Sequence, residues 1–366
     1  MKQPYLLLTP GPLSTTPTVK EAMQIDYCTW DSDYRQVTET IREQILELAQ
    51  ANPDNYTTVL MQGSGTYGVE ATIGTAVPRS GAVLLIAVNG AYGRRLTEIA
   101  DYYDIQHVDV VFDEDQAVDP QVVAAALDEH PEITHFVTVH SETTTGLLNP
   151  IEALIPLMRE RGIITMIDAM SSLGGVPISI DDLGCDYLIS SANKCVQGVP
   201  GFAFIIAKKA TLATTEGNAR SLSLDLFAQW QAMTAQPGKW RFTSPTHVVH
   251  AFAQALIEMK AEGGVLPRYQ RYAANQELLS NGMQGLGFDL VIDPAIQGPI
   301  ITSFKYPSEH FDFDDFYQFI KERGFVIYPG KVSAIPSFRI GTIGDINTTD
   351  IKRLLAIISD YQALQH

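Results

Sequence analysis

Short apolar runs recur between residues 57 and 207, and segments long enough for a helix separate most of them. Near-continuous apolar strands are typical of a mostly parallel sheet that helices cover on both faces. The runs that we interpret as strands are residues 57–61, 82–88, 133–139, 163–167, 187–189 and 202–207. The last three lie close together, and Gly198-Val199-Pro200-Gly201 predicts a turn between neighbouring strands. This part of the chain therefore predicts an α/β fold.

The pattern changes near residue 263. A helix predicted over residues 248–260 meets Gly263-Gly264, which is the best candidate for a domain boundary. The remaining hundred or so residues alternate short strands with two helices, which indicates a small α+β domain. The expected strands lie near residues 289–292, 300–304, 325–328 and 337–340, and the expected helices over residues 314–322 and 349–362.

Composition narrows the range of functions. The formal net charge of −17 argues against a nucleic-acid or anionic-membrane partner, because phosphate surfaces select basic patches. If a protein with this much negative charge binds small anions, it must gather its few cations in one site. The three cysteines, with no CxxC pair, predict neither a disulfide framework nor a metal site. With no secretory signal and no apolar segment long enough to span a bilayer, we expect a cytoplasmic protein.

Two charged residues follow neighbouring apolar runs. Asp168 closes the run at 163–167, and Lys194 comes five residues after the run at 187–189. The ends of adjacent parallel strands meet at one edge of a sheet, so the two side chains should converge. A lysine that forms a Schiff base and a carboxylate that pairs with a pyridine nitrogen are the requirements of pyridoxal phosphate chemistry. The alternative is that both are ordinary solvated or capping groups.

A glycine-rich segment, GSGTYG at residues 63–68, follows the first clear strand and leads into a helical segment. Free backbone N–H groups at a helix N-terminus favour a phosphate, and Ser64 and Thr66 add hydroxyl donors. The segment is not a Walker loop, because no Gly-Lys-Ser/Thr follows at the required spacing. A plain tight turn is the alternative.

Further polar candidates follow the other strands. Tyr92 lies between two glycines after the run at 82–88, so its ring could stack on a flat cofactor. Thr143 follows the run at 133–139 and could bond the phenolic oxygen of a pyridoxal, although a serine/threonine-rich turn explains the same residues. His140 could equally be a satisfied strand-end histidine.

Two segments nearer the C-terminus carry arginines. Residues 240–246, WRFTSPT, suggest a contact at a neighbouring active site, although helix capping by Ser244 or Thr246 explains part of them. Arg339 lies inside an apolar strand, where a charge needs a partner. It predicts either an internal salt bridge or a bidentate clamp for a carboxylate or phosphonate.

These segments together resemble the class V (fold type I) pyridoxal-phosphate aminotransferases along almost the whole chain. The resemblance rests on motifs that span both halves: LTPGP at 8–12, CTWD at 28–31, HSETTTG at 140–146, SSANKC at 190–195, KWRFTSPT at 239–246 and FRIG at 338–341. It implies a homodimer with the active site at the interface and a large domain with a mostly parallel seven-stranded sheet. It also implies three segments: an N-terminal arm at 1–20 that packs with the small domain, a large cofactor-binding domain at 21–262 and a small C-terminal α+β domain at 263–366.

The resemblance also implies roles by position. Lys194 would be the Schiff-base lysine and Asp168 the pyridinium partner, with Asn193 near the lysine. Tyr92 would stack on the ring, and Thr143 would bond its phenolic oxygen. The remaining cofactor contacts would come from Ser64, Gly65 and Thr66 on the phosphate, and from Thr243 and Trp240 reaching the partner's phosphate. Arg339 would bind the acidic end of the substrate, and no metal is implied.

The activity implied is transfer of the amino group of 2-aminoethylphosphonate to pyruvate, giving phosphonoacetaldehyde and L-alanine, as in phosphonate degradation. A doubly charged phosphonate calls for a second cation, for which Arg94 and Arg95 are candidates. The alternatives that keep the cofactor are a serine or alanine–glyoxylate aminotransferase and a lyase acting on a related aminophosphonate. A nucleotide-binding protein or a scaffold with a vestigial site is the alternative from another class.

Overall fold

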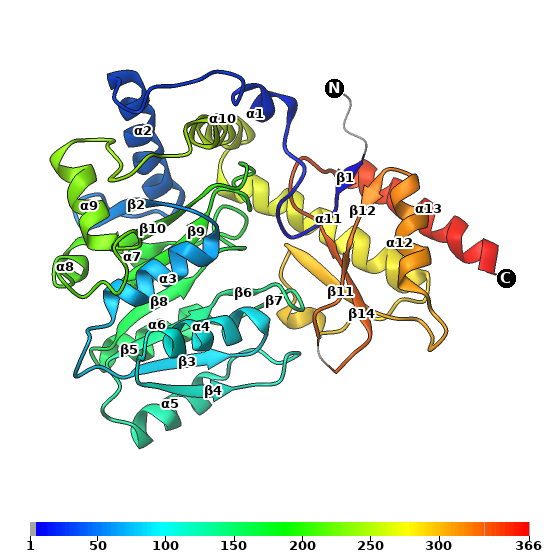
Figure 1. Cartoon of the computed structure of the whole chain (residues 1–366). Coiled ribbons are helices and arrows are strands. Elements are labelled where there is room, and N and C mark those ends of the chain that lie inside the picture. Colours follow the sequence, from blue (N-terminus) through cyan, green and yellow to red (C-terminus); the bar gives the residue numbers. More distant parts are fainter. Residues whose placement is uncertain (1–4, 333, 366) are drawn as a thin grey trace.

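The computed structural model describes residues 5–332 and 334–365. Its centre is a seven-stranded sheet in which only β10 runs against its neighbours (Figure 1). The strands, in spatial order, are β2 (Tyr56–Gln62), β10 (Phe202–Lys208), β9 (Tyr187–Ser191), β8 (Ile164–Asp168), β5 (His135–Val139), β3 (Leu84–Val88) and β4 (His107–Val111). The mostly parallel α/β sheet is confirmed, and β9 and β10 are antiparallel neighbours on either side of the predicted turn.

One strand of this sheet, β4, was not among the predicted apolar runs. It is an edge strand, and of its five residues only Val110 is buried while Asp109 and Val111 are exposed. A strand with one neighbour and one open side needs no continuous apolar run, so its sequence lacks the signal that identified the others.

Helices cover both faces of the sheet. Side chains of β3 alternate between two cores: Leu85 and Ala87 belong to one, and Leu84 and Ile86 to the other. The first core includes buried residues of α2, α5, α6 and α10, and the second includes those of α3 and α4. The longer helices of this part are α2 (Ser32–Leu48), α3 (Gly65–Ala76), α4 (Ala91–Tyr102), α5 (Pro120–Glu129), α6 (Ile151–Glu160), α9 (Leu226–Ala235) and α10 (Thr246–Glu262). The shorter elements are α1 (Pro17–Glu21), α7 (Ile180–Leu183), α8 (Lys209–Leu212) and the paired strands β6 (Ser141–Glu142) and β7 (Leu147–Leu148).

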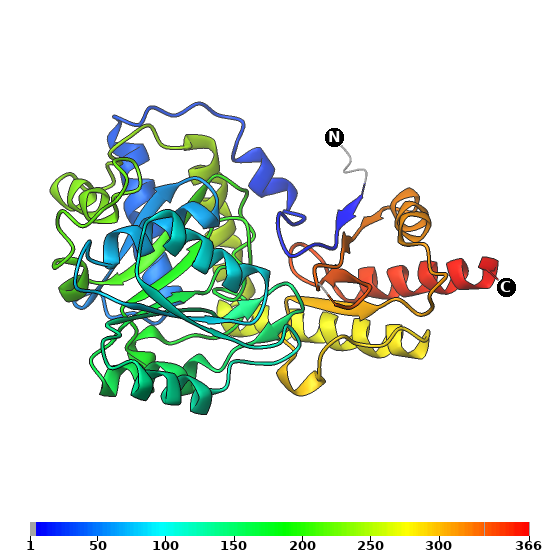
Figure 2. The same ribbon diagram turned by 60° about the horizontal axis from the view of Figure 1, so that its bottom comes forward.

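The C-terminal part lies beside the sheet, and α11 (Val265–Gly285) runs from one to the other in both ribbon views (Figures 1 and 2). It holds a small antiparallel sheet in the order β11-β14-β13 and its own aromatic core around Phe288, Phe316 and Phe338. Its elements are β11 (Ile301–Lys305), α12 (Phe313–Glu322), β12 (Phe325–Val326), β13 (Tyr328–Pro329), β14 (Ser337–Gly341), α13 (Thr348–Gln365) and the short turn η1 (Pro294–Ile296).

The strand expected near residues 289–292 is wrong. There the chain forms only a single bridge, between Leu290 and Phe304. Asp293 caps η1 and Pro294 begins it, so the run turns before a longer ladder can form.

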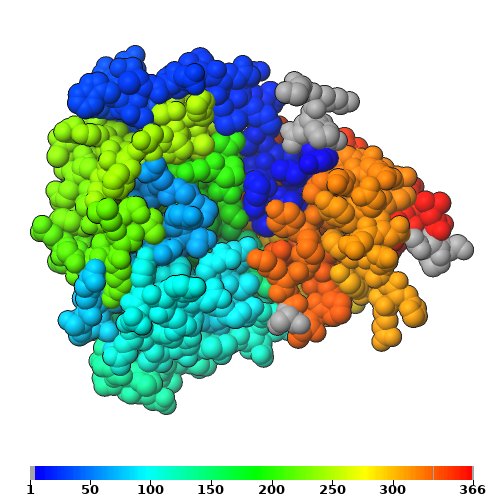
Figure 3. Space-filling model, viewed as in Figure 1, coloured from blue at the N-terminus to red at the C-terminus, as the bar shows by residue number. Residues whose placement is uncertain are grey.

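The N-terminal segment reaches across to this part. Strand β1 (Leu6–Leu7) pairs with β12, and the backbone N–H of Gly341 donates to the carbonyl of Leu8 at 2.9 Å. In the space-filling view this dark blue segment lies between the green part of the chain and the orange C-terminal part (Figure 3). The predicted boundaries at residues 20 and 262 stay predictions, and residues 1–4 of the expected arm lie outside the described residues. No helix among those described combines the length and apolar character needed to cross a bilayer.

Candidate active site

The site lies where parallel strands of the large sheet end. Val139 at the end of β5 pairs with Asp168 at the end of β8, and Asp168 pairs with Ile189 of β9. The segments that leave these strands therefore start side by side at one edge of the sheet, the usual place for a ligand in an open α/β fold. Asp168 and Lys194 both line one cavity there, as the spacing of the sequence predicts.

Asp168 is only 6% exposed and is held by the chain segment that follows it. The backbone N–H of Met170 donates to its Oδ1 at 2.9 Å. Burial nevertheless raises the pKa of Asp168 to about 6, because the Met170 N–H bond and the charges of Lys194 and Arg95 only partly offset the loss of water. A cation placed against this carboxylate would keep it ionised.

Lys194 follows β9 and lies under the N-terminal segment. Its Nζ donates to the carbonyl of Pro10 at 2.9 Å. A Cβ on Gly11 would lie 2.6 Å from the Lys194 Cδ, so only glycine leaves room for the lysine at this point. Burial lowers the pKa of Lys194, which increases the fraction of the nucleophilic free amine.

The predicted phosphate loop forms the N-terminus of α3. Ser64 is the N-cap residue, but its side chain caps no N–H group of the helix, so the positive helix end is open to an anion. A Cβ on Gly65 would lie 2.2 Å from the Sδ of Met170, so only glycine fits beside this side chain. Arg95 adds a positive charge here, with its Nη1 3.4 Å from the Thr66 Oγ1.

Tyr92 lies on the opposite side of the cavity, at the start of α4. The buried carboxylate of Glu142 fixes this corner: Oε2 accepts from the Gly93 N–H at 3.2 Å, and Oε1 accepts from the Thr144 N–H at 3.0 Å. Burial opposes ionisation of the Tyr92 phenol, but a hydrogen bond with Thr143 and the charges of nearby cations together lower its pKa.

Arg339 adjoins this corner from the small sheet. The residue is 3% exposed, and its guanidinium donates to two backbone carbonyls, with Nη1 2.8 Å from Thr143 O and Nε 3.0 Å from Pro329 O. The Tyr92 phenol also interacts electrostatically with it. No ion pair among the described residues includes Arg339, so the internal salt bridge considered as an alternative is not formed.

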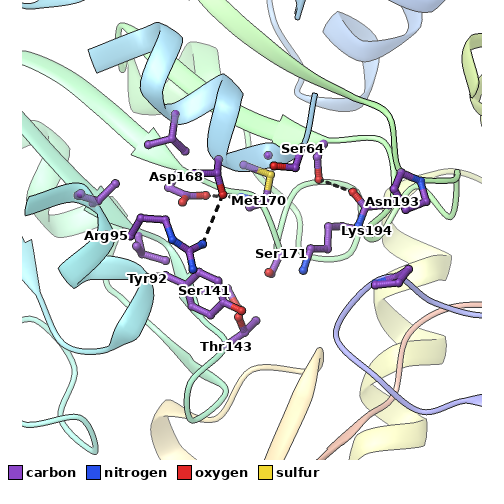
Figure 4. A pocket seen from close by; sticks show the side chains of 18 residues that line it. Ser64, Tyr92, Arg95, Ser141, Thr143, Asp168, Met170, Ser171, Asn193 and Lys194 are labelled. Carbon is purple, nitrogen blue, oxygen red and sulfur yellow. Dashed lines mark hydrogen bonds between the residues drawn. The ribbon is translucent and has the colours of Figure 1, made fainter. Parts of the chain in front are cut away.

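Most of the predicted site residues share one cavity of about 300 Å³ (Figure 4). Those lining it are Ser64, Gly65, Thr66, Tyr92, Thr143, Asp168, Asn193 and Lys194. Trp240 and Thr243 line a separate cleft instead, together with the exposed Trp30 and Phe242. The Trp240 ring is buried against Phe202, whereas Thr243 is exposed.

Several lining residues were not singled out from the sequence. Ser141, Met170 and Ser171 each follow a strand end within three residues, which is the signal that could have identified them. Pro12 comes from the distant N-terminal segment, and nothing local in the sequence places it at the sheet edge. Of the two candidate arginines, Arg95 lines the cavity, while Arg94 pairs with Glu114 at 2.5 Å.

Comparison with known proteins identifies the family. The model of the "Aminotransferase class-V" family matches residues 26–347. The chain belongs to the class-V aminotransferases. It is 80% identical to the 2-aminoethylphosphonate–pyruvate transaminase of Lactiplantibacillus plantarum over 364 residues, which covers 100% of both chains. It is 53% identical to the Bacillus cereus protein of the same name, covering 97% of each chain. Among solved structures, the alanine–glyoxylate aminotransferase from Nostoc sp. superimposes with a TM-score of 0.89 at 25% identity, over 97% of this chain and 94% of that one.

Class-V aminotransferases use pyridoxal 5'-phosphate, and the cavity of this class-V aminotransferase fits that cofactor. The Ser141 Oγ lines the cavity, is buried and has no hydrogen-bond partner among the described residues, so a polar ligand atom would satisfy it. The open end of α3 suits a phosphate, the buried Asp168 suits a protonated ring nitrogen, and Lys194 supplies the amine. The three groups occupy different walls of the same cavity.

Proposed function

We propose that this chain transfers the amino group of 2-aminoethylphosphonate to pyruvate, giving phosphonoacetaldehyde and L-alanine. The observation that carries the proposal is the 80% identity, over the full length of both chains, to a relative named for this reaction. The site geometry agrees with the proposal, because a buried lysine, a buried carboxylate and the uncapped N-terminus of α3 face one cavity.

The residues take distinct parts in the proposed reaction. Asp168 would hold the ring nitrogen, while Ser64, Gly65 and Thr66 would hold the phosphate. Tyr92 would lie against the ring, and Thr143 and Asn193 would contact its edge. When bound, pyridoxal phosphate withdraws electrons from the substrate carbon and stores the amino group between the half-reactions.

Lys194 has two tasks in this proposal. It attaches the cofactor, and once displaced its Nζ takes a proton from the amino-bearing carbon of the substrate as general base. The lowered pKa of Lys194 supports this, because it increases the fraction of the neutral amine, the form that can accept a proton. Arg339 would bind the phosphonate of one substrate and the carboxylate of the other.

We also propose a homodimer in which Thr243, and less directly Trp240, contact the cofactor phosphate of the partner subunit. The exposed aromatic residues beside them support this: Trp30 is 71% exposed and Phe242 44% exposed in the single chain. Sedimentation of the purified protein at micromolar concentration should give twice the 40.2 kDa chain mass, and a monomer would refute the dimer. A cytoplasmic location stays a prediction from the sequence.

The visible spectrum of the purified protein tests the reaction. 2-Aminoethylphosphonate without a keto acid should abolish the absorbance band of the bound cofactor, and pyruvate should restore it with formation of alanine. A Lys194→Ala variant should show no turnover. A band that persists with 2-aminoethylphosphonate but disappears with serine would refute the proposed donor and move the enzyme to the glyoxylate-using aminotransferases.

A further inference from the structure

The phosphonate end of the proposed substrate needs more positive charge than Arg339 offers. Two donors of its guanidinium, Nε and Nη1, are already bound to the carbonyls of Pro329 and Thr143. A guanidinium has five N–H donors, so three remain. These suit the two oxygens of a carboxylate better than the three oxygens and two charges of a phosphonate.

The two arginines suggested by the sequence lie elsewhere. Arg94 pairs with Glu114, and Arg95 points to Thr66 and acts on Asp168 at the cofactor end of the cavity. In Figure 4, Arg95 lies near Asp168, across the cavity from Lys194. Arg95 also lies 5.0 Å from the centroid of the Tyr92 ring, but its Nη1 is directed at Thr66, so we assign it to the cofactor end.

Lys331 is beside the corner that Arg339 forms with Tyr92. It follows β13 after one glycine, and its Nζ lies 4.9 Å from the centroid of the Tyr92 ring. The hydroxyl end of the same ring interacts with Arg339. Lys331 is exposed and takes no part in the ion pairs formed within residues 5–332 and 334–365. Tyr92 therefore has three cations as neighbours: Arg95 toward the cofactor end, the buried Arg339 and the exposed Lys331.

The geometry of the two proposed substrates fits this arrangement. In pyruvate the carboxylate carbon is bonded directly to the reacting carbon, whereas in 2-aminoethylphosphonate a methylene group separates the reacting carbon from phosphorus. If both reacting carbons lie at the same point, the phosphonate extends one bond farther from it. Lys331 is more exposed than Arg339. We therefore expect the phosphonate, which is the longer and more highly charged group, to contact Lys331.

We propose that Lys331 is the second cation of the substrate site and that, together with Arg339, it favours a dianionic phosphonate over a monocarboxylate. This inference rests on the proposed function. Arg339 binds either acid group, and Lys331 adds its charge when the group is a phosphonate.

A charge-removing variant tests the inference. Lys331→Met keeps most of the side-chain length, Lys331→Arg keeps the charge, and Lys352→Met removes an equally exposed lysine from α13 as a matched control. Binding is measured by calorimetry on the cofactor-loaded protein, with 2-hydroxyethylphosphonate and its carboxylate analogue 3-hydroxypropanoate, neither of which carries the amino group.

Lys331→Met should weaken 2-hydroxyethylphosphonate binding by about tenfold, the loss expected for one charged hydrogen bond, and change 3-hydroxypropanoate binding by less than about twofold. KM for 2-aminoethylphosphonate should rise by a similar factor, with the alanine half-reaction unchanged. The effect should shrink at a pH low enough to protonate the phosphonate once. Lys331→Arg and Lys352→Met should behave like the wild type.

Equal losses for the phosphonate and the carboxylate, or no loss for either, would overturn the role of Lys331. If the wild type itself fails to react with 2-aminoethylphosphonate, the proposed function fails, and the inference fails with it. If the wild type reacts with 2-aminoethylphosphonate and Lys331→Met is unaffected, the inference about Lys331 fails while the proposed function stands.

Discussion

Replacing Asp168 by asparagine should make the cofactor-free protein more stable at alkaline pH while abolishing tight cofactor binding. Asp168 is 6% exposed, and burial raises its pKa from 3.8 to about 6. The folded state therefore holds this proton more tightly than the unfolded state does. Stability from this group is greatest at low pH and falls as the pH rises from about 4 to about 6.

The magnitude follows from the two pKa values. The difference between 3.8 and about 6 corresponds to about 3 kcal/mol of destabilisation once the group is ionised in both states. At pH 5 the same linkage relation gives a destabilisation of about 1.6 kcal/mol. Asparagine cannot ionise, and its carbonyl can still accept the Met170 N–H. The stability advantage of Asp168→Asn should therefore grow by about 1.4 kcal/mol between pH 5 and pH 8.

The assay is urea unfolding of the cofactor-free wild type and variant at both pH values and at one protein concentration. Asp54→Asn, which replaces an exposed carboxylate in the turn before β2, is the control for the chemical change itself. An Asp168→Asn advantage that is absent, or that does not grow with pH, would show that burial of this carboxylate is not a cost to the fold.

Three further substitutions probe the walls of the cavity. Gly65→Ala places a Cβ 2.2 Å from the Met170 Sδ and should lower the free energy of unfolding by about 1–3 kcal/mol in urea, with Met170→Ala in the same chain recovering most of the loss. Glu142→Gln replaces a buried acceptor of the Gly93 and Thr144 N–H groups and should cost about 1–3 kcal/mol in the same assay; an unchanged midpoint would refute the anchoring role of Glu142. Gly11→Ala should displace Lys194 and slow the appearance of the visible band when cofactor is added, whereas Gly81→Ala, which also has positive φ but open space around it, should leave that rate unchanged.

The large sheet could be predicted because its strands are buried on both faces. Six of the seven strands appear as apolar runs, and the one that was missed, β4, lies at an edge with four of its five residues partly buried or exposed. The same local signal failed at residues 289–292, where an apolar run is ended by the turn at Asp293 and Pro294. Apolar content therefore identified buried backbone but not how far each ladder extends.

The convergence of Asp168 and Lys194 on one cavity could be predicted for a topological reason. Adjacent parallel strands end at the same edge, so residues just beyond two such ends meet however long the connecting helix is. Other decisions needed the folded chain. Arg94 and Arg95 are adjacent in sequence but point about 100° apart on α4, so helix phase alone sends one to Glu114 and the other to the cavity.

The sequence by itself predicted the lysine, the carboxylate and the glycine-rich loop as site residues, and it identified the family. Tertiary structure alone decided the surroundings, because they come from segments far apart in the chain. Pro10 contacts Lys194 across 184 residues, and Arg339 binds the Thr143 carbonyl across 196. Lys331, just after β13, comes within 4.9 Å of the Tyr92 ring at the start of α4. Contacts of that kind depend on the packing of whole elements, which no local pattern of residues specifies.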